Sequence, residues 1–401
     1  MRISTAQLYN QSVSSINQHQ SSSSALMDQI SSGKRVNTAG DDPVASIGID
    51  NLSQQNTLID QFLKNIDYAK NHLGLAETQT DNAETVLSSM REKISAAVNG
   101  TLTDDERQGV ADELNAGLQE LLTIANSRDE SGNYVFAGTA YDQQPFAFDN
   151  SGNIVYSGNN GVRTAVVASG VAIPTNIAGD AVFMNSPSGL GDFNVNYSTS
   201  QTGEFNVTSA QITNSASYVE DDYTLSFTAN GSGGVDLQVF DSASNLISTV
   251  NNYDASNPIS FNGIEIKLSA TPADGDSFSI TPTENVSIFD TIQQAISLLQ
   301  DDTAINSPYG RSELAQLLNN FDSGTDQVRI ARGIAGNSLN SLDSYTDVHS
   351  SAELANTSAL SVLQDLDYAS AVTEFEKQQV ALNASSQLFG RLSSFNLFDF
   401  I

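Results

Sequence analysis

The fold is decided by the stretch from residue 59 to residue 97, IDQFLKNIDYAKNHLGLAETQTDNAETVLSSMREKISAA. Apolar or small residues recur in this stretch at alternating intervals of three and four, without a break. They are Ile59, Phe62, Ile66, Ala69, Leu73, Ala76, Thr80, Ala83, Leu87, Met90, Ile94 and Ala97. This spacing is typical of a helix that packs along one seam of a coiled coil or helical bundle. At about 1.5 Å per residue, the helix would be about 58 Å long, which is more than a compact domain needs.

The flanking sequence extends the helical pattern. Between about residue 3 and residue 127 the only proline is Pro43. Asp42-Pro43 is typical of a helix start, because an N-cap acceptor precedes a proline at the first helical position. The capping box Thr103-Asp104-Asp105-Glu106 then predicts a shorter helix. Its apolar face would hold Val110, Leu114, Leu118 and Leu121.

The C-terminal part mirrors the N-terminal part. We expect a short helix from Ser287 to about Leu299, and a long helical stretch from near Ser312. Residues in heptad register along that stretch are Leu314, Leu318, Phe321, Val328, Ala335, Leu339 and Leu342, with Thr325 and Arg332 as polar breaks. The pattern blurs after His349 and recovers less cleanly at Val372, Phe375, Leu382 and Phe389. Since each half needs a partner for its apolar stripe, the simplest arrangement is an antiparallel bundle of the two halves.

Strand signals are concentrated between residues 133 and 286. Residues 134–136 and 154–156 are short apolar runs bounded by Gly and Asn, and residues 223–227 alternate before the hairpin-type turn Asn230-Gly231. Residues 259–266 have the pattern of strand, turn and strand. We therefore predict an α+β fold, in which a long antiparallel helical bundle or coiled coil made from both chain ends carries an inserted, mainly β outer region.

The predicted domain boundaries follow from these patterns. Residues 1–42 form an N-terminal assembly helix and signature loop, and residues 43–132 form the N-terminal half of the bundle. Residues 133–286 form the outer β-region, which either is one domain or divides into two near residues 185–191. Residues 287–365 complete the bundle, and residues 366–401 form a C-terminal assembly helix.

Composition excludes several classes of function. The chain has 16 basic and 47 acidic residues, a net charge of −31, so it repels phosphate backbones and we expect no nucleic-acid partner. It has no cysteine, which excludes disulfides, thiolate metal sites and a cysteine nucleophile. No apolar run approaches the ~18 residues that span a bilayer, so no membrane contact is expected. Residues 1–7 lack the apolar segment of a secretory signal.

No pattern singles out an active site. The three histidines, His19, His72 and His349, fall in helical segments, and we interpret them as helix-surface or seam residues. The common catalytic and phosphate-binding motifs are absent. We interpret Gly231–Gly234 as a loop, and both Asp221-Asp222 and Asp274-Gly275-Asp276 as turn residues rather than calcium ligands. The expectation is a protein without catalytic residues, cofactor or metal.

Three groups of residues resemble a known family. Residues 26–37, LMDQISSGKRVN, followed by Asp41-Asp42-Pro43, resemble the N-terminal signature shared by flagellins and hook-associated proteins, as does the start Arg2-Ile3-Ser4-Thr5. Three further segments resemble the hook-associated protein 3 family in particular. They are NYVFAG at 133–138 with Pro145-Phe146, YSG at 156–158 leading to Arg163, and GDSFSITP at 275–282. The C-terminal stretch from Asp367-Tyr368-Ala369 through Gln379, Ala381-Leu382 and Ser385-Ser386 to Leu397-Phe398 is similar to the terminal helix of that family.

This resemblance implies a structural adaptor of the bacterial flagellum. Such a protein forms a junction ring between hook-associated protein 1 and the flagellin filament. The implied partners are hook-associated protein 1, flagellin, copies of the chain itself, and an export chaperone on the C-terminal helix. The implied location is extracellular, reached through the flagellar type III apparatus without a cleaved signal peptide. The alternatives are flagellin itself or, from another class, a secreted adhesin or hydrolase that uses the acidic β-region.

The candidate functional residues fall into two sets. Five of the last seven residues are aromatic or aliphatic, which is unusual at an exposed chain end, so we expect the termini to carry assembly. The assembly residues are Ile3, Leu8, Val13, Ile16, Leu26, Ile30, Leu382, Phe389, Leu392, Phe395, Leu397, Phe398, Phe400 and Ile401. The bundle-seam residues are Ile59, Phe62, Ile66, Leu73, Leu87, Met90, Ile94, Leu314, Leu318, Phe321, Val328, Leu339 and Leu342.

Overall fold

The computed structural model describes residues 5–99, 102–283 and 285–394. The chain divides into two compact units, Met1–Lys64 with Ser344–Ile401, and Asn65–Asp343. Two long helices, α2 (Pro43–Asn99) and α7 (Pro308–Gln364), contribute residues to both units.

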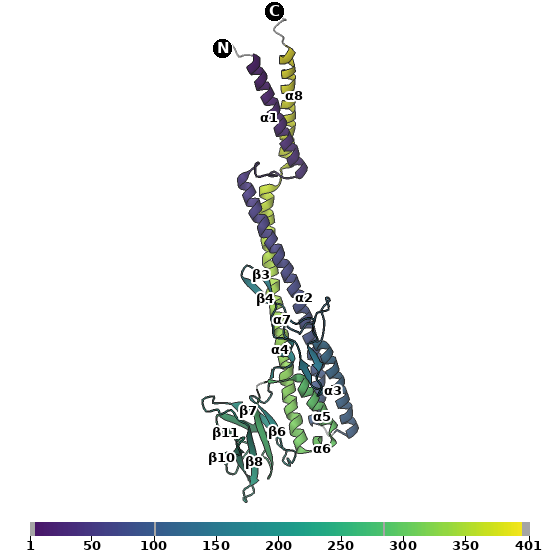
Figure 1. The fold of residues 1–401 in the computed structure, drawn as a ribbon, viewed down its shortest axis with the longest axis vertical. Helices are drawn as coiled ribbons and strands as arrows, with labels where there is room; N and C mark the ends of the chain where they lie inside the picture. Colours follow the sequence, from purple (N-terminus) through teal and green to yellow (C-terminus); the bar gives the residue numbers. More distant parts are fainter. Residues whose placement is uncertain (1–4, 100–101, 284, 395–401) are drawn as a thin grey trace, which may run out of the picture. The chain divides into compact units, whose positions relative to one another are not determined.

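The first unit is helical. It contains α1 (Thr5–Ser32), the beginning of α2, the end of α7, and α8 (Tyr368–Ser394), and α1 lies beside α8 (Figure 1). The predicted start of α2 is confirmed, because Asp42 Oδ1 accepts a hydrogen bond from the Ala45 amide at 3.0 Å and Pro43 is the first helical residue. The glycine after α1, Gly33, has φ +71, the left-handed conformation that commonly ends a helix.

The second unit contains a helical bundle. Beside α2 and α7 it holds α3 (Asp104–Ala125), α4 (Gly179–Phe183), α5 (Ile288–Gln300) and α6 (Asp302–Ile305). The predicted capping box of α3 is confirmed, since the Thr103 side chain accepts from the Glu106 amide and Glu106 Oε2 accepts from the Thr103 amide. The predicted helix after Ser287 is also confirmed, with Ser287 as its N-cap. These helices surround one apolar core, which includes Leu87, Leu114, Leu118, Phe289 and Phe321.

Salt bridges show that α2 and α7 are antiparallel in the second unit. They pair Lys70 with Asp343, Asp81 with Arg332, Glu84 with Arg329, and Arg91 with Asp322. Each step forward along α2 is matched by an equal step backward along α7, so all four pairs share one register. The predicted fold class, α+β with long helices from both chain ends and an inserted β-region, is confirmed.

Three short antiparallel pairs of strands lie at the two ends of the β-region, before residue 188 and after residue 284. They are β1 (Phe146–Phe148) with β2 (Ile154–Tyr156), β3 (Thr164–Ala168) with β4 (Val171–Pro174), and β5 (Ser186–Pro187) with β14 (Asn285–Val286). Phe146 packs against Phe183 and Phe289 with ring centroids 5.6 and 5.3 Å apart. This segment therefore shares the apolar core of the bundle.

Residues 190–280 form a second apolar core between two sheets. The five-stranded sheet has the order β10-β9-β8-β13-β6, and the three-stranded sheet has the order β11-β12-β7. Their bounds are β6 (Phe193–Tyr197), β7 (Val207–Ile212), β8 (Tyr223–Ala229), β9 (Val235–Phe240), β10 (Leu246–Val250), β11 (Ile259–Phe261), β12 (Ile264–Leu268) and β13 (Ser277–Pro282). The predicted hairpins are confirmed at β8–β9 and at β11–β12, where Asn262 and Gly263 both have positive φ.

The strand predicted at residues 134–136 is wrong. Tyr134 forms only an isolated bridge with Arg128, and the following residues bend. Phe136 is fully buried in the bundle core, where its ring centroid lies 5.5 Å from that of Phe183. The run is apolar because it fills that core, and Gly138, with φ +69, turns the chain directly afterwards.

Candidate functional site

The bundle-seam residues lie in both units, and all of them are at least half-buried. In the second unit Ile66, Leu73, Leu87, Met90, Ile94, Leu314, Phe321, Val328 and Leu342 are buried, and Leu318 and Leu339 are half-buried. In the first unit Ile59 is buried, and the half-buried Phe62 stacks on His349 with ring centroids 5.4 Å apart.

The terminal helices α1 and α8 form the candidate assembly site. The ring centroids of Tyr9 and Phe389 are 4.9 Å apart, and His19 Nδ1 lies 2.8 Å from Gln378 Oε1. Of the predicted assembly residues, Val13, Ile16, Leu26, Ile30, Leu382 and Phe389 are half-buried, and Leu8 is exposed. Ile3, Phe395, Leu397, Phe398, Phe400, Ile401 and the side chain of Leu392 lie outside the described residues.

The loop between α1 and α2 contacts the connection between α7 and α8. Arg35 Nη2 donates to the Leu363 carbonyl at 2.8 Å, and Arg35 Nη1 lies 3.4 Å from Asp42 Oδ2. The Leu366 amide donates to the Gly33 carbonyl at 3.0 Å. The Ala45 amide, with a smaller contribution from Arg35, holds the pKa of Asp42 below its usual value. Sequence reasoning used this loop only as a family signature and did not identify Arg35 as a residue that ties the two chain ends together.

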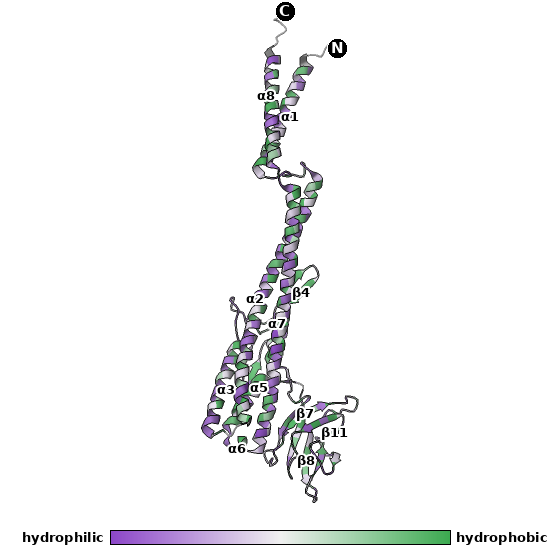
Figure 2. Ribbon diagram, turned by 180° about the vertical axis from the view of Figure 1, so that it is seen from behind, coloured by the Kyte–Doolittle hydropathy of each residue, from purple (hydrophilic) through white to green (hydrophobic). Residues whose placement is uncertain are grey.

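Few apolar side chains of the first unit are covered. Among its described residues, the buried apolar side chains are Val36, Ala45, Ile59 and Ala371. Exposed large apolar side chains lie on all four of its helices, and the most exposed are Val44 (82%), Val362 (79%), Leu354 (74%), Val380 (68%), Ile47 (64%), Leu388 (61%) and Val348 (61%). Figure 2 shows hydrophobic positions distributed along α1 and α8. We take these exposed apolar side chains as part of the candidate assembly site.

The other candidate groups have local structural roles. Asp276 accepts from the amides of Thr202 and Ala273 at 2.8 and 2.7 Å, and Asp274 accepts from the Ala229 amide at 2.7 Å, so both are turn residues as predicted. Within the described ranges, no cluster of three or more His, Asp or Glu side chains could hold a metal. None of the helices in those ranges is both long enough and apolar enough to cross a bilayer.

Comparison with known proteins gives the class first. Residues 3–141 match the bacterial flagellin N-terminal helical region. Polar flagellin A of Vibrio parahaemolyticus is 30% identical over 146 residues, which are 36% of this chain and 38% of that relative. Such homologues are structural proteins of the bacterial flagellum and not enzymes, so the chain is a flagellin-like structural protein.

More specific matches give the family. Flagellar hook-associated protein 3 of Salmonella typhimurium is 37% identical over 146 residues, 36% of this chain, and the match spans 46% of that relative's length. The flagellar junction protein FlgL from Legionella pneumophila has a TM-score of 0.68 and 32% identity, over 80% of this chain and 99% of that one. FlgL from Xanthomonas campestris has a TM-score of 0.66 and 27% identity, over 76% and 98% of the two chains. The chain belongs to the flagellar hook-associated protein 3 family, also called FlgL.

Proposed function

We propose that the chain is an adaptor that forms the junction ring between hook-associated protein 1 and the flagellin filament. The observation that carries this proposal is the apolar surface of the first unit, whose N-terminal part, on α1 and the beginning of α2, lies in the region that matches flagellin. The relative from Legionella pneumophila is itself a flagellar junction protein. The proposed partners are hook-associated protein 1, flagellin and further copies of the chain.

The exposed side chains of α8 are suited to burial between subunits. Burial of one large apolar side chain contributes about 1.5–3 kcal/mol, so Val380 and Leu388 together supply several kcal/mol to a contact. Before assembly the same side chains face water, which favours aggregation. A chaperone that covers the C-terminal helix would prevent this aggregation until export.

Export through the flagellar type III apparatus is part of the proposal. The chain has no cysteine, so no disulfide would hinder its passage through a narrow channel in the unfolded state. In this proposal the mature protein is extracellular and reaches the flagellum without a cleaved signal peptide.

Deletion of residues 389–401 tests the proposed role of the terminal helices. The second unit has its own apolar cores, so the truncated protein should remain a soluble monomer with an unchanged melting temperature. Cells that make only this protein should carry hooks without filaments in electron micrographs, and should release flagellin into the medium. Filaments of normal length on the truncated protein would overturn the proposal, and global unfolding would show that the tail belongs to the core of the monomer.

Copy number separates the junction from the filament. A junction protein is present as a small fixed number of copies in each sheared flagellum, whereas a flagellin accumulates in proportion to filament length. Quantitative immunoblotting of sheared flagella of different lengths measures this ratio. Copy number that rises with length would favour the flagellin alternative.

A further inference from the structure

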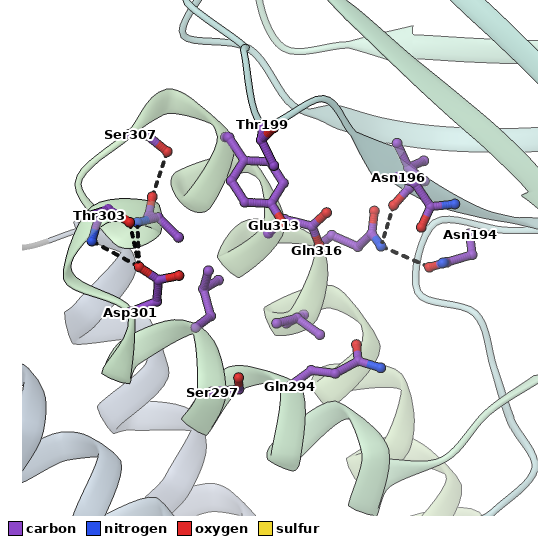
Figure 3. A pocket seen from close by; sticks show the side chains of 15 residues that line it. Asn194, Asn196, Thr199, Gln294, Ser297, Asp301, Thr303, Ser307, Glu313 and Gln316 are labelled. Atoms are coloured by element: carbon purple, nitrogen blue, oxygen red, sulfur yellow. Dashed lines mark hydrogen bonds between the residues drawn. The ribbon is translucent and has the colours of Figure 1, made fainter.

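A polar cavity lies in the second unit, between strand β6 and the helices α5, α6 and α7 (Figure 3). Its volume is about 680 Å³, within the range of about 300–1,000 Å³ that is usual for small-molecule sites. Asn194 and Asn196 line it from β6, Gln294 and Ser297 from α5, and Glu313 and Gln316 from α7. The role proposed above for the terminal helices makes no use of this cavity.

The lining is polar, and its charged side chains are the two carboxyls of Asp301 and Glu313. Its amides and hydroxyls can both donate and accept hydrogen bonds, and the half-buried ring of Tyr309 adds an apolar face. No lysine or arginine of the described chain lines the cavity, and the whole sequence carries a net charge of −31. The Asp301 carboxylate is already used, because its Oδ1 accepts from the amides of Thr303 and Ala304 at 3.0 Å. An anionic ligand is therefore disfavoured.

Gln316 has one hydrogen-bonding atom without a partner. The side chain is only 4% exposed, and its Nε2 donates to Asn194 Oδ1 at 2.9 Å and to the Val195 carbonyl at 3.0 Å. Its Oε1 is buried and accepts no hydrogen bond from the residues that the structure describes. An unpaired buried acceptor is unfavourable, and the hydroxyl of a ligand would relieve it once the Gln316 side chain turns Oε1 toward the cavity.

Glu313 lies one helical turn before Gln316 on the same wall of the cavity (Figure 3). Burial raises the pKa of its carboxyl to about 7. Among the described residues no lysine or arginine forms a salt bridge with it. Near neutral pH much of this group is protonated, so it can donate one hydrogen bond and accept others without bringing a full charge into the cavity.

We propose that this cavity binds a small uncharged polyhydroxylated molecule, of the size and class of a mono- or disaccharide. The hydroxyls of a sugar both donate and accept, which matches the amides of Asn194, Asn196 and Gln294. A sugar carries no charge that would need a basic partner. Its apolar C–H face can pack on the Tyr309 ring. A cationic amine is the competing ligand, because it would ionise Glu313 and pair with it.

The test is titration of the purified full-length protein with glucose, N-acetylglucosamine and trehalose. Calorimetry and ligand-observed NMR monitor the binding of each sugar. At least one sugar should bind saturably, with a dissociation constant in the millimolar range. Asn196→Ala and Gln294→Ala change exposed side chains, so the fold should be kept while affinity falls by about fivefold, as expected for one lost neutral hydrogen bond. The matched control is Gln300→Ala, an exposed glutamine of α5 that does not line the cavity.

A further variant separates the neutral ligand from a cationic one. Glu313→Gln keeps the shape and the hydrogen-bonding capacity of the side chain but cannot ionise, so sugar binding should persist. Putrescine serves as the cationic probe. The proposal is overturned if none of the three sugars binds, if only putrescine binds and Glu313→Gln abolishes that binding, or if Asn196→Ala and Gln294→Ala bind sugar as the unaltered protein does.

Discussion

Arg329 of α7 donates from Nε to Glu84 Oε1 of α2 across 2.7 Å, and Arg332, almost one turn further along α7, lies 2.7 Å from the other oxygen of the same carboxylate. The Glu84 side chain is only 18% exposed, so this contact is less screened by solvent than an ordinary surface pair. It shares its antiparallel register with the pairs of Lys70, Asp81 and Arg91. The charges thus select one register along a seam whose apolar residues alone would tolerate a shift by one heptad.

Reversal of one charge in this contact should destabilise the bundle. In Arg329→Glu the new carboxylate would face the half-buried Glu84, and we expect a loss of about 1–3 kcal/mol in the free energy of unfolding. Urea denaturation, monitored by circular dichroism, measures this loss. The matched control is Lys377→Glu, where both partners are exposed and the loss should stay below about 0.5 kcal/mol. Equal midpoints for the two variants would mean that the contact does not stabilise the bundle.

Substitution within the seam should cost more. Leu73 is 1% exposed, so Leu73→Asp would place a carboxylate in an apolar site without a partner and should cost about 3 kcal/mol or more. The expected result is a lower melting temperature and a weaker helical signal. Asn71→Asp introduces the same side chain two residues earlier at an exposed position and should change little. If both variants unfold alike, the heptad assignment of α2 is wrong.

The sequence predicted the elements whose signals are local. Heptad spacing marked α2, the capping box at Thr103 marked α3, and Asn230-Gly231 marked the β8–β9 hairpin, because each depends on neighbours in sequence. The strand predicted at residues 134–136 was wrong for the opposite reason, because its structure depends on residues distant in sequence. An apolar run is equally suited to a strand and to a bend whose side chains fill a core, and the partners of Phe136, such as Phe183, are distant in sequence.

The candidate site was predictable only in outline. The apolar pattern blurred after His349, yet α7 continues without interruption to Gln364. In that stretch Leu354 and Val362 are exposed and do not follow the seam, so the spacing of a single interface is lost. The cavity beside Gln316 left no trace in the sequence, because it depends on how β6 packs against α7.

A polar substitution on α8 should separate folding from assembly. Val380 is 68% exposed, so Val380→Asp should leave the melting temperature of the monomer unchanged. If Val380 is buried between subunits, the substitution removes about 1.5–3 kcal/mol per contact, which is a loss of tenfold or more in affinity. Filament length and swimming in a strain that carries the variant measure the effect. Gln379→Asp is the control at the neighbouring exposed position, and equal motility of the two strains would remove Val380 from the interface.

The stability of the second unit should depend on Glu313 in a defined pH window. The pKa of Glu313 is raised from 4.5 to about 7 in the folded protein. Because the folded state holds the proton more tightly, stability falls as pH rises from about 4.5 to 7 and is then constant. Of the groups facing Glu313, Asp301 has a lowered pKa and Tyr197 and Tyr309 have raised pKa values, so none of the three changes charge in this window.

Glu313→Gln tests this linkage. The variant cannot ionise, so it should match the unaltered protein near pH 4.5 and exceed it at pH 8 by roughly 3 kcal/mol in the free energy of unfolding. Urea unfolding at the two pH values measures the difference, and the exposed Glu376→Gln serves as the control for loss of one negative charge. If the free energies of unfolding of Glu313→Gln and the unaltered protein differ by the same amount at both pH values, the prediction is contradicted.

The outer sheets should be removable without loss of the bundle. The chain enters and leaves this region through β5 and β14, where Pro187 pairs with Asn285 and Ser186 with Val286, so the two cut ends already lie side by side. The sheets also have an apolar core of their own. We therefore expect that replacement of residues 187–282 by a short Gly/Ser linker leaves the helical signal and the melting temperature of the bundle nearly unchanged.

The face of α7 that this excision uncovers explains why the loss should be small. The side chains that contact the sheets there include the polar Ser312, Gln316 and Asn320, which hydrogen-bond to Phe205, Val195 and Gly189 respectively. The half-buried Tyr309 also packs against the core of the sheets. After the excision these polar groups would hydrogen-bond to water instead. A face made of apolar side chains would, by contrast, have been left in unfavourable contact with water. Filaments should still attach, because the proposed assembly surface lies on the terminal helices. The measurements are circular dichroism of the purified protein and motility of cells that export it. Loss of motility with normal export would place a partner contact on the outer sheets, and unfolding of the purified protein would show that the two cores depend on each other.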